Sequence, residues 1–225
     1  MIIVTGASSG IGKEICLSLR KRGKKVLGIA RTELNEEFAS VSCDVGNFNA
    51  LKQIARQLRK DKIPVTGLVN AAGIASMNLT TATDYVTTQD IIQTNLLGTI
   101  FSCQVFSPLI FRQKKGAIIN FSTIAVHLGL KGESIYVASK AGVEGFTRSF
   151  AREAADFGVS VNCIAPGPID TKLIQNIPEN KITDIINQQI VQRKIRMSEL
   201  SSTVEMLLTA ETCTITGQTI NLGGI

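Results

Sequence analysis

Short apolar runs rich in β-branched residues alternate along the chain with longer stretches in which apolar positions recur every three to four residues. The short runs predict strands and the longer stretches predict helices. The predicted strands cover residues 2–5, 25–30, 41–43, 67–70, 117–121, 159–164 and 219–222. The predicted helices cover residues 10–22, 47–60, 89–112, 136–156 and 198–209. Most strand runs are apolar at nearly every position, as in parallel strands buried on both faces. The alternation therefore predicts an α/β fold with a doubly wound parallel sheet of about seven strands.

The spacing of these elements predicts one domain over residues 1–225, because no linker, internal repeat or low-complexity segment interrupts the alternation. One connection is unusually short. Only twelve residues separate Arg31 from Asp44, which is too few for a helix with a turn at each end. We expect this second crossover of the sheet to be shortened to a loop or a single helical turn.

Charge and cysteine content narrow the function. The 24 Lys and Arg against 18 Asp and Glu give a net charge of +6. The basic residues stand in short scattered groups such as 21–25 and 193–196, and Trp is absent, so we expect no nucleic-acid partner. Five widely spaced cysteines without a Cys-x-x-Cys pair argue against disulfides and against a metal site. No uninterrupted apolar run reaches the ~20 residues of a membrane span and no signal-peptide pattern opens the chain, so we expect a cytoplasmic protein.

A glycine-rich segment, Thr-Gly-Ala-Ser-Ser-Gly-Ile-Gly at residues 5–12, links the first predicted strand to the first predicted helix. Its three glycines permit a tight turn and a close approach of the backbone to a pyrophosphate, whose charge is stabilised by the N–H groups of a helix N-terminus. This position favours a dinucleotide-binding loop over a purely structural turn. The loop residues expected to contact the cofactor are Gly6, Ser8, Ser9, Gly10, Ile11 and Gly12.

The spacing Gly6-x3-Gly10-x-Gly12 differs from the G-x-G-x-x-G of two-domain dehydrogenases and resembles the loop of the short-chain dehydrogenase/reductase family, in its short single-domain branch. Further motifs of that family follow in order, at similar spacings: Asp44, the segment 70–73, Asn95, Tyr136-x3-Lys140 and Pro166-Gly167. The resemblance covers essentially the whole chain and is strongest to 3-oxoacyl-[acyl-carrier-protein] reductases. It implies a Rossmann-type three-layer fold and an enzyme that interconverts a ketone and a secondary alcohol by hydride transfer.

The end of the second predicted strand bears on the choice of cofactor. An NAD site needs a carboxylate there for the ribose 2′-OH, whereas an NADP site places a cation nearby. Ala30 stands where the acid is expected and Arg31 follows it, which favours NADP(H) over NAD(H). Glu33 is close by and weakens this preference. The alternative is that Arg31 is only a solvated surface charge. The resemblance implies that Asp44 contacts the adenine. It also assigns further cofactor contacts to Val45, Asn70, Ala71, Gly73, Pro166, Gly167, Ile169 and Thr171.

Tyr136 and Lys140 are four residues apart on a predicted helix, so their side chains share one face. An ammonium beside a phenol favours the phenolate and lowers the pKa of the tyrosine toward a range useful for acid–base catalysis. The resemblance implies that Tyr136 protonates the carbonyl oxygen as hydride arrives. It also implies that Lys140 lowers the Tyr136 pKa and binds the nicotinamide ribose, and that Asn95 supports a water-linked proton relay.

The family places a serine thirteen residues before the tyrosine, and this chain has Thr123 there, preceded by Ser122. We expect the Thr123 hydroxyl to contact the substrate carbonyl and its developing negative charge together with Tyr136. The alternative is that the Ser122 hydroxyl makes this contact after a local shift of the backbone. His127 is the single histidine, and it is either a substrate contact or an incidental loop residue.

Residues 172–197 carry apolar side chains at helical spacing, which predicts a substrate lid or an ordinary packed helix pair. Basic residues that a carrier protein would meet are Arg148, Arg152, Arg193, Lys194 and Arg196, with solvated surface charge as the alternative. We therefore expect a small-molecule or acyl-thioester substrate, with carrier-bound 3-oxoacyl thioesters first. Two alternatives to this function stay open. One is a reductase of another ketone, from a sugar, a steroid-like or a small carbonyl compound, and the other is a non-catalytic nucleotide-sensing protein. We also expect a homo-oligomer, a dimer more than a tetramer because the chain stops soon after its last strand.

Overall fold

The computed structural model describes residues 1–225 except 35, 172–173, 176 and 210–213. Its centre is a seven-stranded sheet of parallel strands in the order β3-β2-β1-β4-β5-β6-β7. The strands are β1 (Ile2–Thr5), β2 (Val26–Ala30), β3 (Ala39–Ser42), β4 (Gly67–Asn70), β5 (Gly116–Phe121), β6 (Val159–Pro166) and β7 (Thr219–Leu222). The predicted α/β fold is confirmed.

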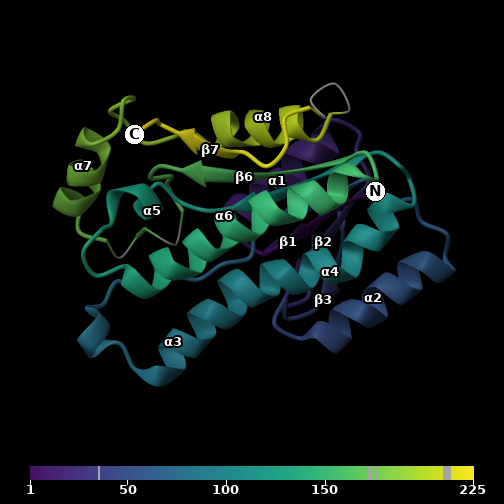
Figure 1. The fold of residues 1–225 in the computed structure, drawn as a ribbon, viewed down its shortest axis with the longest axis horizontal. Coiled ribbons are helices and arrows are strands. Elements are labelled where there is room, and N and C mark those ends of the chain that lie inside the picture. The colour runs from purple at the N-terminus through teal and green to yellow at the C-terminus, as the bar shows by residue number, and fades with distance from the viewer. Residues whose placement is uncertain (35, 172–173, 176, 210–213) are drawn as a thin grey trace.

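Helices cover both faces of the sheet (Figure 1). They are α1 (Gly10–Lys21), α2 (Phe48–Lys60), the 3-10 helix η1 (Thr80–Ala82), α3 (Tyr85–Ile91), the π-helix η2 (Ile92–Leu97), α4 (Gly98–Phe111), α5 (Ala125–Leu128), α6 (Ser134–Ala155), α7 (Glu179–Asn187) and α8 (Met197–Leu207). Side chains of α2, α4 and α6 pack on one face of the sheet, and those of α1 and α8 pack on the other. This is the three-layer arrangement expected of the fold.

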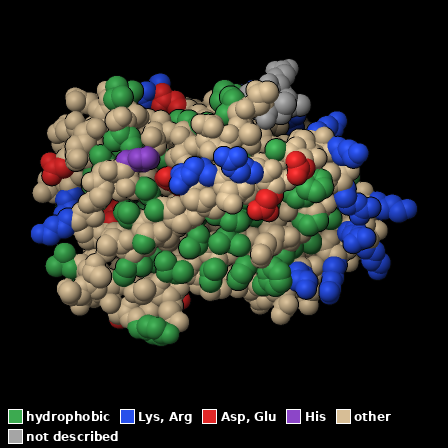
Figure 2. Space-filling model, in the orientation of Figure 1, with side chains coloured by type: hydrophobic (Ala, Val, Ile, Leu, Met, Phe, Trp, Pro, Cys, Tyr) green, Lys and Arg blue, Asp and Glu red, His purple; other side chains and the backbone are tan. Residues whose placement is uncertain are grey.

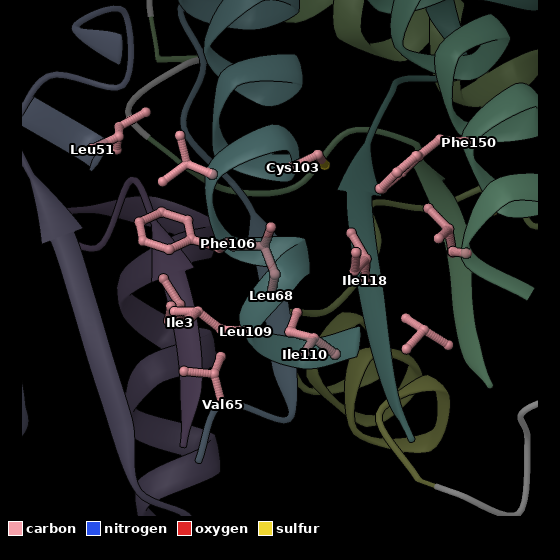
Figure 3. Packing of buried hydrophobic residues seen from close by; sticks show 14 of the residues in the cluster. Ile3, Leu51, Val65, Leu68, Cys103, Phe106, Leu109, Ile110, Ile118 and Phe150 are labelled. Atoms are coloured by element: carbon pink, nitrogen blue, oxygen red, sulfur yellow. The ribbon is translucent and has the colours of Figure 1, made fainter. Parts of the chain in front are cut away.

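Each buried strand supplies both hydrophobic layers because successive side chains point to opposite faces. Ile3, Leu68 and Ile118 join the layer under α4, where Figure 3 shows them among side chains of α4 such as Phe106 and Ile110. Their sequence neighbours Val69 and Ile119 belong to the opposite layer, under α1 and α8. The near-continuous apolar character of the strands follows from this double burial.

The long helical stretch before β5 runs without a break from α3 through η2 to α4. The expected helix at 89–112 therefore begins four residues earlier than predicted, at Tyr85. By length and composition alone, Tyr85–Phe111 is apolar enough to cross a membrane, and half of its most apolar window is buried inside the fold. Polar residues such as Gln93 and Asn95 interrupt it, which is why the sequence shows no uninterrupted apolar run there.

The second crossover, between β2 and β3, contains no helix in its described residues 31–34 and 36–38. In place of a helix, Phe38 is buried against the sheet in the layer that contains Ala7 and Ile15. Gly28 in β2 makes room for that ring, since a Cβ there would lie 2.6 Å from Phe38 Cε2. The predicted short loop is confirmed, and one aromatic side chain covers the area that a helix usually occupies.

Parallel strands bring their carboxyl ends to one edge of the sheet, and helices that follow them begin at that edge. The centre of this edge is braced by buried amides. Asn70 Nδ2 donates to Asn120 Oδ1 at 2.8 Å, and Asn120 Nδ2 donates to Thr147 Oγ1 of α6 at 2.9 Å. These bonds tie β4 and β5 to α6, which carries Tyr136 and Lys140.

Candidate active site

The glycine loop folds as a tight turn between β1 and α1. Gly6 has φ +71°, and a Cβ on it would lie 2.7 Å from the backbone nitrogen of Ala72. A Cβ on Gly12 would lie 2.3 Å from the Gly6 carbonyl oxygen. Ser9 precedes α1 without capping it by a side-chain hydrogen bond, so the first N–H groups of the helix are not capped by its own N-cap residue. A loop of this shape with a helix N-terminus suits the pyrophosphate of a dinucleotide.

A groove of ≈ 320 Å³, called here the cofactor groove, runs along this loop and the carboxyl ends of β2 and β4. Its walls contain most of the predicted cofactor-binding residues: Gly6, Ser8, Ser9, Gly10, Ile11, Arg31, Asp44, Val45, Ala71, Gly73 and Thr171. Gly12 and Asn70 lie behind the walls, where Gly12 allows the loop to close and Asn70 braces the sheet. Ala72, from the segment 70–73 expected to line the cofactor, is also in the wall, and Ile74 and Thr94 are wall residues that the sequence did not indicate.

The adenosine end of the groove carries both predicted side chains. Arg31 is exposed at the end of β2, and none of the salt bridges between described residues involves it. Asp44 accepts a hydrogen bond from the backbone N–H of Gly46 at 2.7 Å, which fixes its carboxylate beside the groove. A cation without a carboxylate partner suits an additional phosphate.

A second cavity of ≈ 160 Å³, called here the inner cavity, adjoins the cofactor groove, and the two share Ile11, Ala71, Gly73 and Thr171 as walls. Three predicted catalytic side chains and the predicted turn after β6 line it. These residues are Thr123, Tyr136, Lys140, Pro166, Gly167 and Ile169. The sequence-predicted constellation therefore converges at the point where groove and cavity meet.

Tyr136 and Lys140 are both buried on α6, with the Lys140 ammonium 6.0 Å from the centre of the Tyr136 ring. Burial raises the pKa of Tyr136 and the charge of Glu133 raises it further, while a hydrogen bond with the Thr123 side chain lowers it. Burial lowers the pKa of Lys140 to about 8, and its ammonium donates to the Phe121 carbonyl at 2.9 Å. The expected net lowering of the Tyr136 pKa is wrong for this geometry, because desolvation of the phenol dominates.

The two neighbouring hydroxyls of the β5 end have different partners. The Ser122 hydroxyl donates to buried Glu144 of α6 at 2.6 Å. The Thr123 hydroxyl accepts from the Ala125 backbone N–H at 3.2 Å and hydrogen bonds to Tyr136. The geometry therefore favours Thr123 over Ser122 as the hydroxyl that meets a substrate.

Asn95 is fully buried in the π-helix η2, a type of helical bulge that recurs at functional sites. Its side chain exchanges two hydrogen bonds with the Ile74 backbone, at 2.8 and 2.9 Å, and donates to Ser139 Oγ at 3.1 Å. Asn95 thus ties the loop after β4 to α6 beside Lys140. All of its side-chain polar atoms have protein partners, so a proton relay through Asn95 stays a prediction.

Part of the predicted lid, residues 172–173 and 176, lies outside the described residues. In the remainder, Ile174, Ile177 and Ile185 line the inner cavity, with Ile185 contributed by α7. His127 is exposed on α5 and is not among the wall residues of the inner cavity.

The predicted basic surface is largely paired with acids. Arg193 and Arg196 both bond Glu199, at 2.7 and 2.8 Å, and Lys194 bonds Asp170 at 2.9 Å. These pairs reduce the positive potential near the lid. On α6, Arg148 lies 4.0 Å from the Glu144 carboxylate.

Two carboxylates in this region were missed in the sequence. Glu144 anchors Ser122, and Glu133 lines the inner cavity one helical turn before Tyr136. The spacing of three from Tyr136 was the available signal for Glu133. A buried phenol with a raised pKa is protonated at neutral pH, so the arrangement presents a proton donor and a second hydroxyl to a carbonyl oxygen.

The chain matches known oxidoreductases along its length. The family model for short chain dehydrogenase matches residues 1–182. The chain is 33% identical to the 3-oxoacyl-[acyl-carrier-protein] reductase of Vibrio cholerae, over 99% of this chain and 95% of that protein. It is 31% identical to the Escherichia coli protein of the same name, with the same coverage.

Solved structures give the same fold. Aldohexose dehydrogenase of Thermoplasma acidophilum superposes with a TM-score of 0.90 at 30% identity, over 99% of this chain and 92% of that chain. A structure from Agrobacterium tumefaciens has a TM-score of 0.91 at 24% identity, over 100% and 94% of the two chains, and supports the fold alone. The chain belongs to the short-chain dehydrogenase/reductase family and is an oxidoreductase that uses a nicotinamide dinucleotide.

Proposed function

We propose that the protein is an NADP(H)-dependent reductase of 3-oxoacyl thioesters, which converts the 3-ketone to a secondary alcohol. The observation that carries the proposal is the inner cavity, which contains Tyr136, Thr123 and Lys140 and shares four wall residues with the cofactor groove. The nicotinamide supplies the hydride when the cofactor is bound. Tyr136 delivers the proton to the carbonyl oxygen, and the Thr123 hydroxyl donates a hydrogen bond to the same oxygen.

Lys140 has a supporting part in this reaction. Its ammonium is held by the Phe121 carbonyl, and its pKa of about 8 leaves it largely protonated at neutral pH. In this position it binds the nicotinamide ribose and attracts the negative charge that develops near Tyr136 during proton transfer. Asn95 fixes the segment around Ile74 that faces Lys140.

The thioester assignment has two supports. The inner cavity is lined by Ile124, Leu130, Ile174, Ile177 and Ile185, an apolar wall suited to the carbon chain of an acyl group. Relatives at 31–33% identity are named 3-oxoacyl-[acyl-carrier-protein] reductases. Arg31, which has no acid within 4.0 Å among the described residues, supports NADP(H) as the preferred cofactor.

The direct assay follows NADPH absorbance with an acetoacetyl thioester, in parallel with NADH and with a Tyr136→Phe variant. We expect rapid consumption of NADPH, slow consumption of NADH and almost none in the variant. Equal rates of NADPH oxidation in wild type and Tyr136→Phe would refute the assigned proton donor. If the purified protein oxidises neither NADPH nor NADH, the assignment of the thioester as substrate is refuted.

A sugar or other polyol is the second candidate substrate. The Thermoplasma acidophilum relative with a TM-score of 0.90 is an aldohexose dehydrogenase, and Glu133 adds a hydrogen-bond acceptor to the cavity wall. NADP⁺ reduction with a panel of aldohexoses distinguishes the two candidates, because the thioester reductase leaves these sugars unchanged.

We also propose an assembly and a partner from the surface. Figure 2 shows hydrophobic side chains gathered over the face that α4 and α6 present, and Phe101 and Phe146 on these helices are only partly buried. This face supports the proposed homo-oligomer, and a dimer is the expected state in size-exclusion chromatography with light scattering. A cytoplasmic location and docking of an acidic carrier protein near Arg148 and Arg152 remain proposals. Docking predicts that salt reduces the rate on carrier-bound substrate more than on a small ketone.

A further inference from the structure

The inner cavity is apolar except for a few groups, and Glu133 has the single carboxylate among the described residues of its wall. Glu133 is 9% exposed. It is the N-cap residue of α6, yet its side chain makes no capping hydrogen bond. In the part of the chain that the structure describes, no hydrogen bond and no ion pair within 4.0 Å reaches its carboxylate. A partly desolvated carboxylate without a partner destabilises the fold, although the positive end of a helix offsets part of this.

Glu133 also lies where two cavities meet. A cavity of ≈ 380 Å³, called here the outer cavity, shares Leu130, Glu133 and Ile185 with the inner cavity. Lys181 of α7 lines the outer cavity. Burial raises the pKa of Glu133, and the charge of Lys181 offsets part of this shift. A substrate whose ketone reaches Tyr136 in the small inner cavity can extend its remaining atoms past Glu133 into the outer cavity.

We infer that Glu133 is a specificity-determining residue that accepts a hydrogen bond from an uncharged donor of the substrate, a hydroxyl or an amide N–H, at the junction of the inner and outer cavities. The inference rests on the proposed function for the position of the ketone. The same carboxylate disfavours a substrate that carries a negative charge at this point. An amide N–H belongs to the thiol arm of an acyl thioester, and a hydroxyl belongs to a polyol.

The test compares ketones matched in size. One pair is the acetoacetyl thioester of N-acetylcysteamine, which has an amide N–H, and the corresponding S-pentyl thioester. The other pair is 4-hydroxy-2-butanone and 2-pentanone. A hydrogen bond to a charged acceptor predicts a kcat/KM about 10- to 100-fold higher for the donor-bearing member. The first pair reports an amide-bearing arm and the second a hydroxyl.

Substitutions separate this role from a structural one. In Glu133→Ala the ratio of kcat/KM between the members of each pair falls to about 1, and this ratio cancels any effect that the loss of the charge beside Tyr136 has on both members. Glu133→Gln keeps an acceptor oxygen, so it keeps part of the preference and raises kcat/KM for the anion acetoacetate. General damage to the fold would lower kcat/KM for every substrate, so it cannot explain a lower kcat/KM for the donor-bearing ketones together with a higher kcat/KM for acetoacetate. Glu153→Ala, the same change at an exposed position of α6, leaves every ratio unchanged.

Binding gives a readout that does not need turnover. Calorimetry is carried out on the Tyr136→Phe variant with NADP⁺ bound. The ligands are the 3-hydroxy products of the two thioesters, and 1,3-butanediol against 2-pentanol. The donor-bearing member of a pair is expected to bind more tightly, and this difference is expected to be lost when Glu133→Ala is added. If wild-type protein reduces thioesters without any preference, the inference is refuted and the proposed function stands. If the protein reduces none of the ketones yet binds with the preference, the proposed function is refuted and the role of Glu133 stands. Absence of any preference in both experiments overturns the inference.

Discussion

Removing either of the two hydroxyls at the end of β5, those of Thr123 and Ser122, is expected to have opposite effects on activity and stability. Replacing Thr123 with Val removes the hydroxyl that hydrogen bonds to Tyr136 and keeps nearly the same volume. Loss of one donor to a developing oxyanion reduces kcat by about 100- to 1,000-fold. The only described protein hydrogen bond lost besides that to Tyr136 is the 3.2 Å bond from the Ala125 N–H, so unfolding becomes easier by about 1 kcal/mol at most.

Replacing Ser122 with Ala has the reverse effect. The change removes the 2.6 Å donor of Glu144, whose side chain is buried and which keeps only Arg148 at 4.0 Å. Leaving a buried carboxylate without its donor costs about 2 kcal/mol, which lowers Tm by about 4–8 °C in a chain of this size. The geometry at Tyr136 is retained, so kcat at a temperature where the protein is folded stays within about threefold of wild type.

The assay measures kcat for NADPH oxidation and Tm by calorimetry on both variants. Full turnover in Thr123→Val, or a large loss of turnover in Ser122→Ala with an unchanged Tm, would refute the assignment of the two hydroxyls. Thr123→Ser is the matched control, because it keeps the hydroxyl and is expected to retain most activity.

Three further predictions follow from the cofactor groove and the buried lysine. Arg31→Ala raises KM for NADPH by about tenfold and leaves KM for NADH nearly unchanged, in steady-state kinetics; equal effects on both would contradict a 2′-phosphate contact. Gly12→Ala places a Cβ 2.3 Å from the Gly6 carbonyl, so dinucleotide binding measured by fluorescence titration falls more than tenfold; normal affinity would contradict the loop geometry. Lys140 has a pKa lowered from 10.5 to about 8, so below pH 8 its burial destabilises the fold, and stability is regained as pH rises above 8. Buried thiols such as Cys103, whose pKa is raised from 9.0 to about 12, lose stability over the same range, so the lysine is read from a difference in denaturant titrations: between pH 8 and 9.5 the stability of wild type is expected to rise relative to that of Lys140→Met. The window ends below the titration of Tyr136, and parallel curves would show that Lys140 is not desolvated.

The sheet and its large helices were predictable because their pattern follows from burial. Strands such as 2–5 are apolar at three of four positions and sit between two helical layers. The helix Glu179–Asn187 was predicted only as part of an apolar lid, since its pattern does not show where it begins or ends. The helix-free crossover was foreseen from its length, but that Phe38 packs into the space left by Gly28 depends on contacts between distant residues.

Within the site, the sequence indicated which residues converge and not what each is bonded to. Ser122 and Thr123 are adjacent and chemically alike, and the partner that separates them, Glu144, lies on another element. The direction of the Tyr136 pKa was wrong because helical spacing gives the nearness of Lys140 and not the burial of the phenol. The basic residues near the lid are visible in the sequence, but their pairing with acidic side chains, Glu199 among them, is not apparent there.

The most direct test of the reductase assignment is the destination of the hydride. The protein is incubated with NADPH deuterated at the transferred C4 position and an acetoacetyl thioester, and the product is analysed by mass spectrometry and NMR. The account predicts a 3-hydroxy thioester with deuterium at C3, formed by wild type and almost absent with Tyr136→Phe. Loss of NADPH without deuterium at C3, or equal labelling by Tyr136→Phe, would contradict it.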